Sequence, residues 1–435
     1  MKISVLTLFP DIYKPFFATS LIGKAVEKKI IEYSINDMFA ACRPKERIDA
    51  ATYGHGAGMV IKPEAVESMI NTVESVHGRA YRIFFSPHGI KLDQRVCREI
   101  VEKSAAYNNH IMTIAARYEG MDARVEEEFA DIILSVGDFV LMGGDLPSMV
   151  FIEAFLRYVP GVVGNEASVE HDSFTGALVD YPEYSAPLVW RNREVPSIVR
   201  SGNHATIAQW RLQAAAKRTM QSHFEWFRSA CPSEAEVAAI KKEIPSHYAV
   251  LMHDEIMLPQ DRIGTTSVTS LDLHDIARSA RTYGLKKYFI VTPLLDQQRI
   301  VKTLLDFWNI GAGVTYNKER HEAVSLVEMY STFDEVKKRI VELENKEPLV
   351  IATSAKAGAD IEIITYKDQG MIWKIERPVL FVFGTGRGLT NAFISLCDYA
   401  LVSLKGMSSY NHLSVRSAAA VIFDRWLGLQ PRSKK

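Results

Sequence analysis

Two kinds of hydrophobic pattern alternate along the first 160 residues of the chain. Short apolar runs rich in β-branched side chains, at residues 3–9, 81–87 and 110–116, are typical of strands. Between them, residues 91–107 and 123–134 carry apolar side chains at helical spacing. This alternation predicts an α/β fold with a mostly parallel sheet and helices on its faces.

The alternation stops near residue 160 and resumes near residue 246. Residues 161–175 are polar, glycine-bearing and aperiodic, which predicts a loop. Residues 176–245 contain two helical stretches and predict a small helical module. From residue 246 to 435 the strand–helix rhythm returns, which predicts a second α/β domain. A length of 435 residues agrees with two or three domains.

The composition of the chain excludes some classes of protein but does not by itself indicate a function. The chain is 47% hydrophobic and 24% charged, with a formal net charge of -1, so a nucleic-acid partner requires a local basic patch. The four cysteines form no C-x-x-C pair, which argues against a disulfide framework or a cysteine zinc site. No apolar run approaches the roughly 18 residues of a membrane span. We therefore expect a cytoplasmic protein without a membrane segment.

Three glycine-bearing stretches follow the strands predicted in the first domain: "FFSPHGIK", "IAARYEGMD" and "SVGDFVLMGGDLP". Strand ends of a parallel sheet share an edge, so these stretches predict one pocket lined by glycine and backbone. No phosphate-binding motif accompanies them, which favours an adenosine-like ligand over a triphosphate. The alternative is three ordinary strand-to-helix turns. Asp145 is expected to cap the next helix, with Pro147 in its first turn.

Two charged residues near the 161–175 loop form a candidate acid–base pair. Asp172 lies in the loop and Arg157 ends the helix before it. A carboxylate base beside an arginine suits removal of a weakly acidic proton while a neighbouring oxygen gains negative charge. The alternative is that Asp172 caps a turn and Arg157 lies on a solvated face.

The helical module contains a local basic patch. Trp190 and Trp210 are interleaved with its charges, and Glu194 is the only acid between residues 191 and 218. Cations that contact phosphates and aromatic rings that stack on bases suit structured or looped RNA. The alternative is a solvated basic helix with core tryptophans. The basic residues are Arg191, Arg193, Arg200, Arg211, Lys217 and Arg218.

An ordered set of motifs within residues 1–245 resembles a known family. The set includes "LTLFPDIY", "YGHGAGMV", "ARYEGMDARV", "SVGDFVLMGGDLPSM", "YPEYSAPLVW" and "SGNHATIAQWR". It resembles the bacterial tRNA (guanine-N1) methyltransferases of the trefoil-knot (SPOUT) superfamily. The resemblance implies a knotted domain that binds S-adenosylmethionine and methylates N1 of the guanosine immediately 3′ of the anticodon (position 37). It also implies recognition of the anticodon stem-loop and a homodimer whose active sites are shared between subunits.

The resemblance also assigns roles to matching residues. Asp172 corresponds to the general base, contributed by the partner subunit, and Arg157 to the group that steadies guanine O6. Glu119 corresponds to a glutamate that orients substrate or Mg²⁺, so Mg²⁺ is kept as a candidate ion. The implied cofactor-binding residues are Pro87, Gly89, Ala116, Tyr118, Gly120, Val136, Gly137, Asp138, Phe139, Val140, Leu141, Gly143 and Gly144.

Three positions depart from the family pattern. Ala116 replaces a glycine and narrows the pocket by a methyl group. Phe139 replaces a tyrosine, which loses a hydroxyl and keeps the ring. His55 replaces a glycine of the "YGGG" motif and puts an imidazole where RNA is expected to pass. None of the three removes a proposed catalytic group.

The second half resembles another branch of the same superfamily. Its "LFVFGTGRGL" is similar to the glycine motif of that branch, and "SSYNHLSVRSAAAVIFDRW" to its closing cofactor loop and helix. The fold implied is thus two trefoil-knotted (SPOUT-type) domains with a helical module between them. The alternative is a C-terminal half that only binds RNA or dimerises. The implied second cofactor residues are Gly384, Thr385, Gly386, Gly388, Leu389, Leu404, Asn411, His412, Leu413 and Ser414.

Two other classes of function compete with methyl transfer. A nucleotide-hydrolysing or nucleotidyl-transferring enzyme is disfavoured because no phosphate-loop lysine is present. A non-catalytic RNA-binding scaffold is disfavoured because the carboxylate loop and its arginine are both present.

Overall fold

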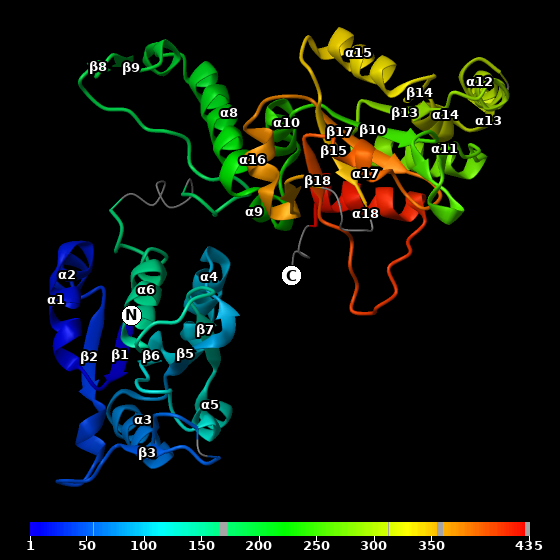
Figure 1. Ribbon diagram of the computed structural model, residues 1–435. Helices are drawn as coiled ribbons and strands as arrows, with labels where there is room; N and C mark the ends of the chain where they lie inside the picture. The colour runs from blue at the N-terminus through cyan, green and yellow to red at the C-terminus, as the bar shows by residue number, and fades with distance from the viewer. Residues whose placement is uncertain (55, 165–171, 312, 355–359, 431–435) are drawn as a thin grey trace. The chain divides into compact units, whose positions relative to one another are not determined.

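The computed structural model describes residues 1–54, 56–164, 172–311, 313–354 and 360–430 (Figure 1). Internal contacts divide the chain into two compact units, Met1–Thr175 and Gly176–Lys435. Each unit is built on one sheet in which every strand pairing is parallel. The expectation of mostly parallel α/β folding is confirmed for both halves.

The first unit has five sheet strands in the order β2-β1-β6-β5-β7, and a small β3–β4 hairpin. The strands are β1 (Lys2–Thr7), β2 (Glu32–Asp37), β3 (Asp49–Ala51), β4 (Met59–Ile61), β5 (Tyr81–Lys91), β6 (His110–Ile114) and β7 (Ile132–Ser135). The helices are α1 (Tyr13–Ala18), α2 (Ser20–Glu27), α3 (Pro63–His77), α4 (Gln94–Ser104), α5 (Ala123–Phe129) and α6 (Asp145–Leu156).

Alternating side chains of β1 explain why helices cover both faces of this sheet. Ile3 and Val5 pack with α1, α2, α4 and α6, whereas Leu6 packs with α3 and α5. A parallel strand buried on both faces is apolar almost throughout, which is why the sequence pattern showed runs rather than strict alternation.

The second unit has seven sheet strands in the order β14-β13-β10-β17-β15-β18-β16. These are β10 (His247–Met252), β13 (Lys287–Val291), β14 (Val327–Tyr330), β15 (Leu349–Thr353), β16 (Ile363–Ile364), β17 (Val379–Gly384) and β18 (Tyr399–Leu401). Two short hairpins lie outside the sheet, β8 (Val189–Trp190) with β9 (Arg193–Glu194), and β11 (Ile256–Met257) with β12 (Ile263–Gly264).

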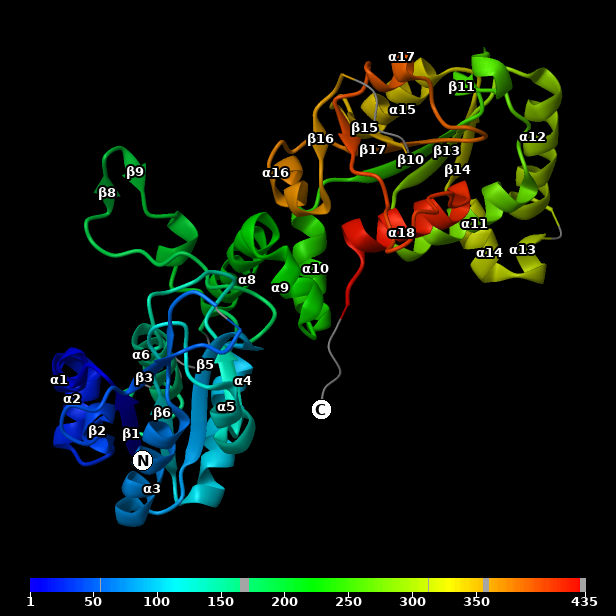
Figure 2. The same ribbon diagram turned by 60° about the horizontal axis from the view of Figure 1, so that its bottom comes forward.

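Helices cover both faces of the second sheet as well (Figure 2). On one face lie α11 and α18, and on the other α15 and α17. The helices are α8 (His204–Ser222), α9 (Phe224–Ser229), α10 (Glu234–Glu243), α11 (Ser270–Thr282), α12 (Leu295–Asn309), α13 (Gly313–Tyr316), α14 (Lys318–Val324), α15 (Phe333–Glu344), α16 (Gln369–Trp373), α17 (Asn391–Ile394) and α18 (Val415–Leu427).

The helices of the predicted module, α8 to α10, belong to the second unit. Ala216, Met220, Phe227 and Ile240 are buried in the same hydrophobic core as Phe381 of β17. The module was expected to stand between two domains as a separate segment. Its apolar face is instead covered by the helices and sheet that follow it in the chain.

Candidate functional site

Two loops of the first unit lie against each other at one edge of its sheet. One follows β6 and the other follows β7, the strands on either side of β5. The Gly144 N–H donates to the Ala116 carbonyl at 2.7 Å. A Cβ at Gly144 would lie 2.8 Å from the Ala116 nitrogen, so glycine is required for this approach. The loop expected to hold an adenosine-like ligand is therefore tied by its backbone to the "ARYEG" loop.

Asp145 joins the same two loops through its side chain. The Arg117 Nε donates to the Asp145 Oδ2 at 2.6 Å, the Arg117 Nη2 lies 2.6 Å from the same oxygen, and the Thr7 hydroxyl donates to Oδ1 at 2.5 Å. Asp145 is fully buried, so the ion pair with Arg117 neutralises a charge that burial would otherwise strongly disfavour. The expectation that Asp145 caps α6 is wrong. The N-cap residue is Gly144, and the Asp145 side chain turns inward to the ion pair.

The "SPHG" segment is part of strand β5 rather than a turn after it. The pairing of β5 with β7 shifts register between Phe85 and Ile90, which marks an irregular segment inside one long strand. Pro87 and Gly89 lie in this segment. A Cβ at Gly89 would lie 2.7 Å from the Leu134 carbonyl carbon, so the segment presses directly on β7.

Apolar side chains of the β7 loop are exposed in the single chain. The Phe139 ring lies over Gly137, where an added Cβ would collide with it. Val140 is 85% exposed and Met142 is 93% exposed. Exposed apolar side chains in succession mark a surface that a ligand or a partner covers. Asp138, in the same loop, is exposed and lies 3.6 Å from Lys91 Nζ.

Glu119 and its neighbours form the rim of the β6 loop. Tyr118 and Gly120 both adopt positive φ, 60° and 113°, in a tight turn closed by a bond from the Gly120 N–H to the Arg117 carbonyl. The Glu119 side chain lies directly over Gly58, where a Cβ would meet its Cγ at 2.6 Å. Glu119 thus faces the "YGHGAG" segment. His55, the departure in that segment, lies outside the described residues.

The structure brings Arg157 and Asp172 together within one chain. Arg157 is the C-cap residue of α6, and its guanidinium donates to the Asp172 carboxylate. The Thr175 hydroxyl donates to the Asp172 backbone carbonyl at 2.6 Å and holds the chain after it. Neither side chain is fully buried, with 39% of Arg157 and 25% of Asp172 exposed, so both stay accessible to a substrate.

The basic residues of the module lie on the surface, and most contact an acidic or aromatic group. Arg200 pairs with Glu194 at 2.7 Å, and the Arg191 guanidinium lies 4.8 Å from the centre of the Trp190 ring. The Arg211 guanidinium lies over the Tyr181 ring, and the Lys217 ammonium is 3.9 Å from the Glu376 carboxylate. The Arg218 guanidinium donates to the Asp180 carbonyl. Arg193 lies opposite Trp190 in the β8–β9 hairpin. Exposed ion pairs are weak, so phosphates can displace these contacts.

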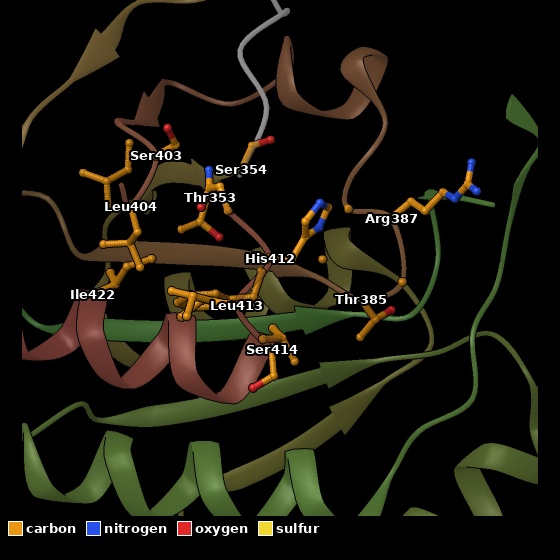
Figure 3. A pocket seen from close by; sticks show the side chains of 18 of the residues that line it. Thr353, Ser354, Thr385, Arg387, Ser403, Leu404, His412, Leu413, Ser414 and Ile422 are labelled. Carbon is orange, nitrogen blue, oxygen red and sulfur yellow. The ribbon is translucent and has the colours of Figure 1, made fainter. Parts of the chain in front are cut away.

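A pocket of about 790 Å³ lies at the carboxyl ends of β15, β17 and β18 in the second unit (Figure 3). This volume is within the usual range for small-molecule sites. Nine of the ten residues expected to hold a second cofactor line it: Gly384, Thr385, Gly386, Gly388, Leu404, Asn411, His412, Leu413 and Ser414. Leu389 does not line it. That side chain is buried, and its backbone nitrogen lies 2.7 Å from where a Gly384 Cβ would be.

A chain of polar groups runs from this pocket into the core. The Thr385 hydroxyl lies 2.5 Å from the Thr266 hydroxyl, which lies 3.1 Å from His253 Nδ1. Burial lowers the pKa of His253 to about 4, so its imidazole is neutral at physiological pH. These hydrogen-bonded groups hold the Thr385 side chain at the pocket wall without introducing a charge.

Sequence reasoning missed several residues of these sites. Arg117 lies between two predicted cofactor residues and carries the ion pair to Asp145. In the second unit, Asp272, Thr353, Arg387 and Ser403 also line the pocket. The usable signal was a threonine or serine at or just beyond the ends of the strands at 349–353 and 399–401.

Within the described ranges, no helix is long and apolar enough to cross a membrane. The same residues contain no group of three or more histidine, cysteine, aspartate or glutamate side chains placed to hold a metal ion.

Two family models match the chain. One, tRNA (Guanine-1)-methyltransferase TrmD, matches residues 1–229, and the other, SAM-dependent RNA methyltransferase, matches residues 246–428. The first match ends within α9 of the second unit and the second begins one residue before β10. Between them the two models account for both parallel sheets.

Curated relatives match the chain over its whole length or its first half. A "tRNA (guanine-N(1)-)-methyltransferase" of Oleidesulfovibrio alaskensis is 36% identical over 98% of this chain and 99% of its own. A protein of the same name from Nitratidesulfovibrio vulgaris is also 36% identical with the same coverage. One from Geobacter metallireducens is 39% identical over 51% of this chain and 89% of its own. The chain therefore belongs to the tRNA (guanine-N1)-methyltransferase family.

Proposed function

We propose that this chain uses S-adenosylmethionine to methylate N1 of the guanosine immediately 3′ of the anticodon in tRNA. The observation that carries the proposal is the Arg157–Asp172 pair, which provides a base and an oxyanion partner directly after the helix that leaves the cofactor loop. Membership of the family supports the reaction, and the position in tRNA is the finer part of the proposal.

The chemistry requires a base because guanine N1 carries a proton at neutral pH. The Asp172 carboxylate accepts that proton, and the electron pair left on N1 becomes available for bond formation. The Arg157 guanidinium donates to O6, where negative charge develops as the proton leaves. In the single chain the Arg157 guanidinium donates to the Asp172 carboxylate. A bound guanine replaces this contact, because its N1–H donates to Asp172 and its O6 accepts from Arg157.

The residues present fit S-adenosylmethionine. Gly144 and Gly89 permit backbone packing that a Cβ would block, and the segments around them carry no phosphate-loop motif. Phe139 and Leu141 provide apolar walls. When bound, the cofactor supplies an electrophilic methyl group on a sulfonium and leaves as a neutral thioether. The protein contributes orientation and exclusion of water.

A homodimer with shared active sites is supported by the length of α6. The cofactor loop precedes Asp145 and the catalytic pair begins at Arg157, so the 12 residues of α6 separate them by about 18 Å. This separation favours a base that is supplied by a second chain. A second chain can bring its Asp172 to the exposed Phe139–Met142 face of the first.

The basic surface of the module, with Trp190 and Trp210, supports binding of the anticodon stem-loop by phosphate contacts and stacking. Since the substrate is tRNA, we place the enzyme in the cytoplasm. Glu119 is the residue that we expect to orient substrate or Mg²⁺, and a single carboxylate with substrate oxygens is a common way to hold that ion.

For the second unit we propose a second S-adenosylmethionine-dependent RNA methyltransferase centre. The pocket at the strand ends and its match to a methyltransferase family support this function. The strand order shared with the first sheet supports a trefoil knot in both. The competing proposal, a unit that only binds RNA or dimerises, predicts that S-adenosylmethionine does not bind there.

Unmodified tRNA transcripts test the first reaction. We expect N1-methylguanosine in a transcript with guanosine after the anticodon, and none when that base is changed to adenosine. Methylation at another guanosine would contradict the proposed position.

Mixed dimers test the shared site. Neither an Asp172→Ala chain nor a Gly144→Leu chain should act alone, because one lacks the base and the other the cofactor loop. A mixture should regain activity, since one site then combines an intact loop with an intact Asp172. No recovery in a verified mixed dimer would show that each chain uses its own residues.

A further inference from the structure

The helical module and the second sheet share one hydrophobic core. Phe224 of α9 packs edge-on against Trp373 of α16 with ring centres 4.8 Å apart. The Gln221 carbonyl lies 2.9 Å from where a Cβ of Gly370 would be, so the two backbones touch. Lys217, one of the predicted tRNA-binding residues, lies 3.9 Å from Glu376 just after α16. The RNA-binding surface is therefore built onto the second unit.

A buried arginine fixes this arrangement. Arg228 of α9 is 5% exposed, and its guanidinium donates to three backbone carbonyls at the end of α18. The bonds reach Asp424 at 2.8 Å, Arg425 at 2.7 Å and Gly428 at 3.0 Å. The last carbonyls of a helix have no partners within it and carry partial negative charge, so a guanidinium stabilises them strongly.

The other end of α18 forms part of the pocket. Ser414, Val415, Ala418 and Ile422 line the cavity, and Figure 3 shows Ile422 on this helix and Ser414 at its start. The 13 residues of α18 span about 20 Å. One rigid helix thus connects the module, through Arg228, with the pocket wall, and an RNA bound to the module has a fixed position relative to that pocket.

The mouth of the pocket has the chemistry of an RNA contact. Tyr410 is 74% exposed, and its ring centre lies 5.4 Å from that of His412, a lining residue. Exposed rings stack on unpaired bases. Arg387 also lines the pocket, and its side chain extends outward in Figure 3, where a phosphate can reach it.

We propose that the second pocket methylates the same tRNA that the helical module binds, at a nucleotide atom other than N1 of the guanosine beside the anticodon. This inference rests on the proposed function, because it takes the module as the tRNA-binding surface. In the reaction, the bond between the methyl carbon and sulfur breaks with its electron pair remaining on sulfur. A nitrogen or oxygen lone pair of the nucleotide forms the new bond, and the proton of that atom passes to solvent.

The first test uses the full-length Asp172→Ala chain, in which the guanine reaction is removed. It is incubated with methyl-labelled S-adenosylmethionine and unmodified tRNA transcripts or, separately, ribosomal RNA. We expect label in tRNA, at least tenfold above that obtained when Ala418→Phe or Ser403→Phe also fills the pocket. These variants enlarge side chains on two different elements, and thermal unfolding confirms that each is folded.

Two results would contradict the inference while leaving the proposed formation of N1-methylguanosine intact. One is a wild-type chain that forms N1-methylguanosine while its Asp172→Ala variant labels no tRNA. The other is label that enters ribosomal RNA alone. If the wild-type chain forms no N1-methylguanosine, the proposed function itself has failed, so the two failures are distinguishable.

A second test asks whether the module serves both reactions. Arg211→Glu combined with Lys217→Glu should lower the guanine reaction of the otherwise wild-type chain and the second reaction of the Asp172→Ala chain by similar factors. Lys338→Glu, an exposed charge change on α15, is the control and should alter neither. A second reaction that is unaffected by the module changes would contradict the inference.

Discussion

The two sheets of this chain follow one strand order, with additions at the edges of the second. The first sheet has the order β2-β1-β6-β5-β7, and the second contains the order β13-β10-β17-β15-β18. In each sheet the strand that comes first in the chain, β1 or β10, lies between the next strand of that sheet along the chain and a strand from later in the chain. In each, a helix leaves the last long loop, α6 in one and α18 in the other. What differs is how the far end of that helix is used. The end of α6 presents Arg157 to Asp172, whereas the end of α18 is capped by Arg228.

The two units thus share a strand order and differ in what α6 and α18 contact. Both units have glycine-bearing loops at the carboxyl ends of their strands, and among the residues that the structure describes only the first has a carboxylate loop paired with the helix end. The second unit instead joins that helix end to the helical module through Arg228. A shared strand order therefore does not imply a shared function, because function depends on the side chains placed at the site.

The largest effect should come from Asp172→Asn. Loss of the base should lower the single-turnover rate of N1-methylguanosine formation by about 10²- to 10⁴-fold. Equilibrium binding of S-adenosylmethionine should remain at two molecules per chain. Gly386→Val, which puts a β-branched side chain at a φ of +56°, is the matching change in the second unit and should reduce that number to one. A near-normal rate in Asp172→Asn would exclude its role as base.

The next effect should come from Asp145→Ala. Removing the buried carboxylate leaves Arg117 without its partner, which should destabilise the first unit by about 3–5 kcal/mol. Hydrogen exchange should show faster opening of β1 and β6 and unchanged protection of β10 and β17. Glu153→Gln, an exposed change on the same helix, is the control. Equal loss of protection in both units would mean that they unfold together.

Acid should affect the second unit more than the first. His247 accepts bonds from the indole N–H groups of Trp373 and Trp426, and burial lowers its pKa to about 4. In the unfolded chain the imidazole of His247 takes up a proton as pH falls below about 6.5, whereas in the folded chain it does so only near pH 4. The free energy of unfolding therefore falls between these two pH values.

At pH 5 this difference amounts to about 2 kcal/mol for His247, with a similar contribution from His253. Hydrogen exchange at pH 7 and pH 5, corrected for intrinsic rates, should show lost protection in β10. In the first unit only His110 has a pKa lowered by burial among the described histidines, so β1 should lose less. Equal losses would contradict the assignment.

The smallest effect should come from Arg211→Gln. Loss of one phosphate contact should weaken tRNA binding modestly and reduce the slope of log affinity against log salt by about 1. Lys338→Gln on α15 provides the control. An unchanged slope would remove Arg211 from the binding surface.

The sequence allowed the architecture to be predicted because buried parallel strands leave a strong local signal. The runs at 3–9 and 110–116 correspond to β1 and β6 within a few residues. The length of β5 was not predictable, since "SPHG" has the composition of a turn and is held in the strand only by its tertiary contact with β7.

Candidate residues could be found from glycine position and family motifs, but their contacts could not. Nine second-unit residues selected by motif do line one pocket. Asp145 has the sequence context of a helix cap, and only the approach of Arg117 from another loop turns it inward. Likewise, nothing local in the module indicates that its apolar face packs on α16 and α18.

The Arg228 contact has a practical consequence for anyone who divides this protein. The family match for the first half ends at residue 229, so a fragment cut there retains Phe224, Phe227 and Arg228 without the partners that bury them. Such a fragment would expose an apolar surface, and its Arg228 would lose the three carbonyls at the end of α18, while the remaining piece would lose the cap of that helix. The end of the first family match therefore lies inside a hydrophobic core and not between two domains. We expect both pieces to aggregate if the chain is cut there.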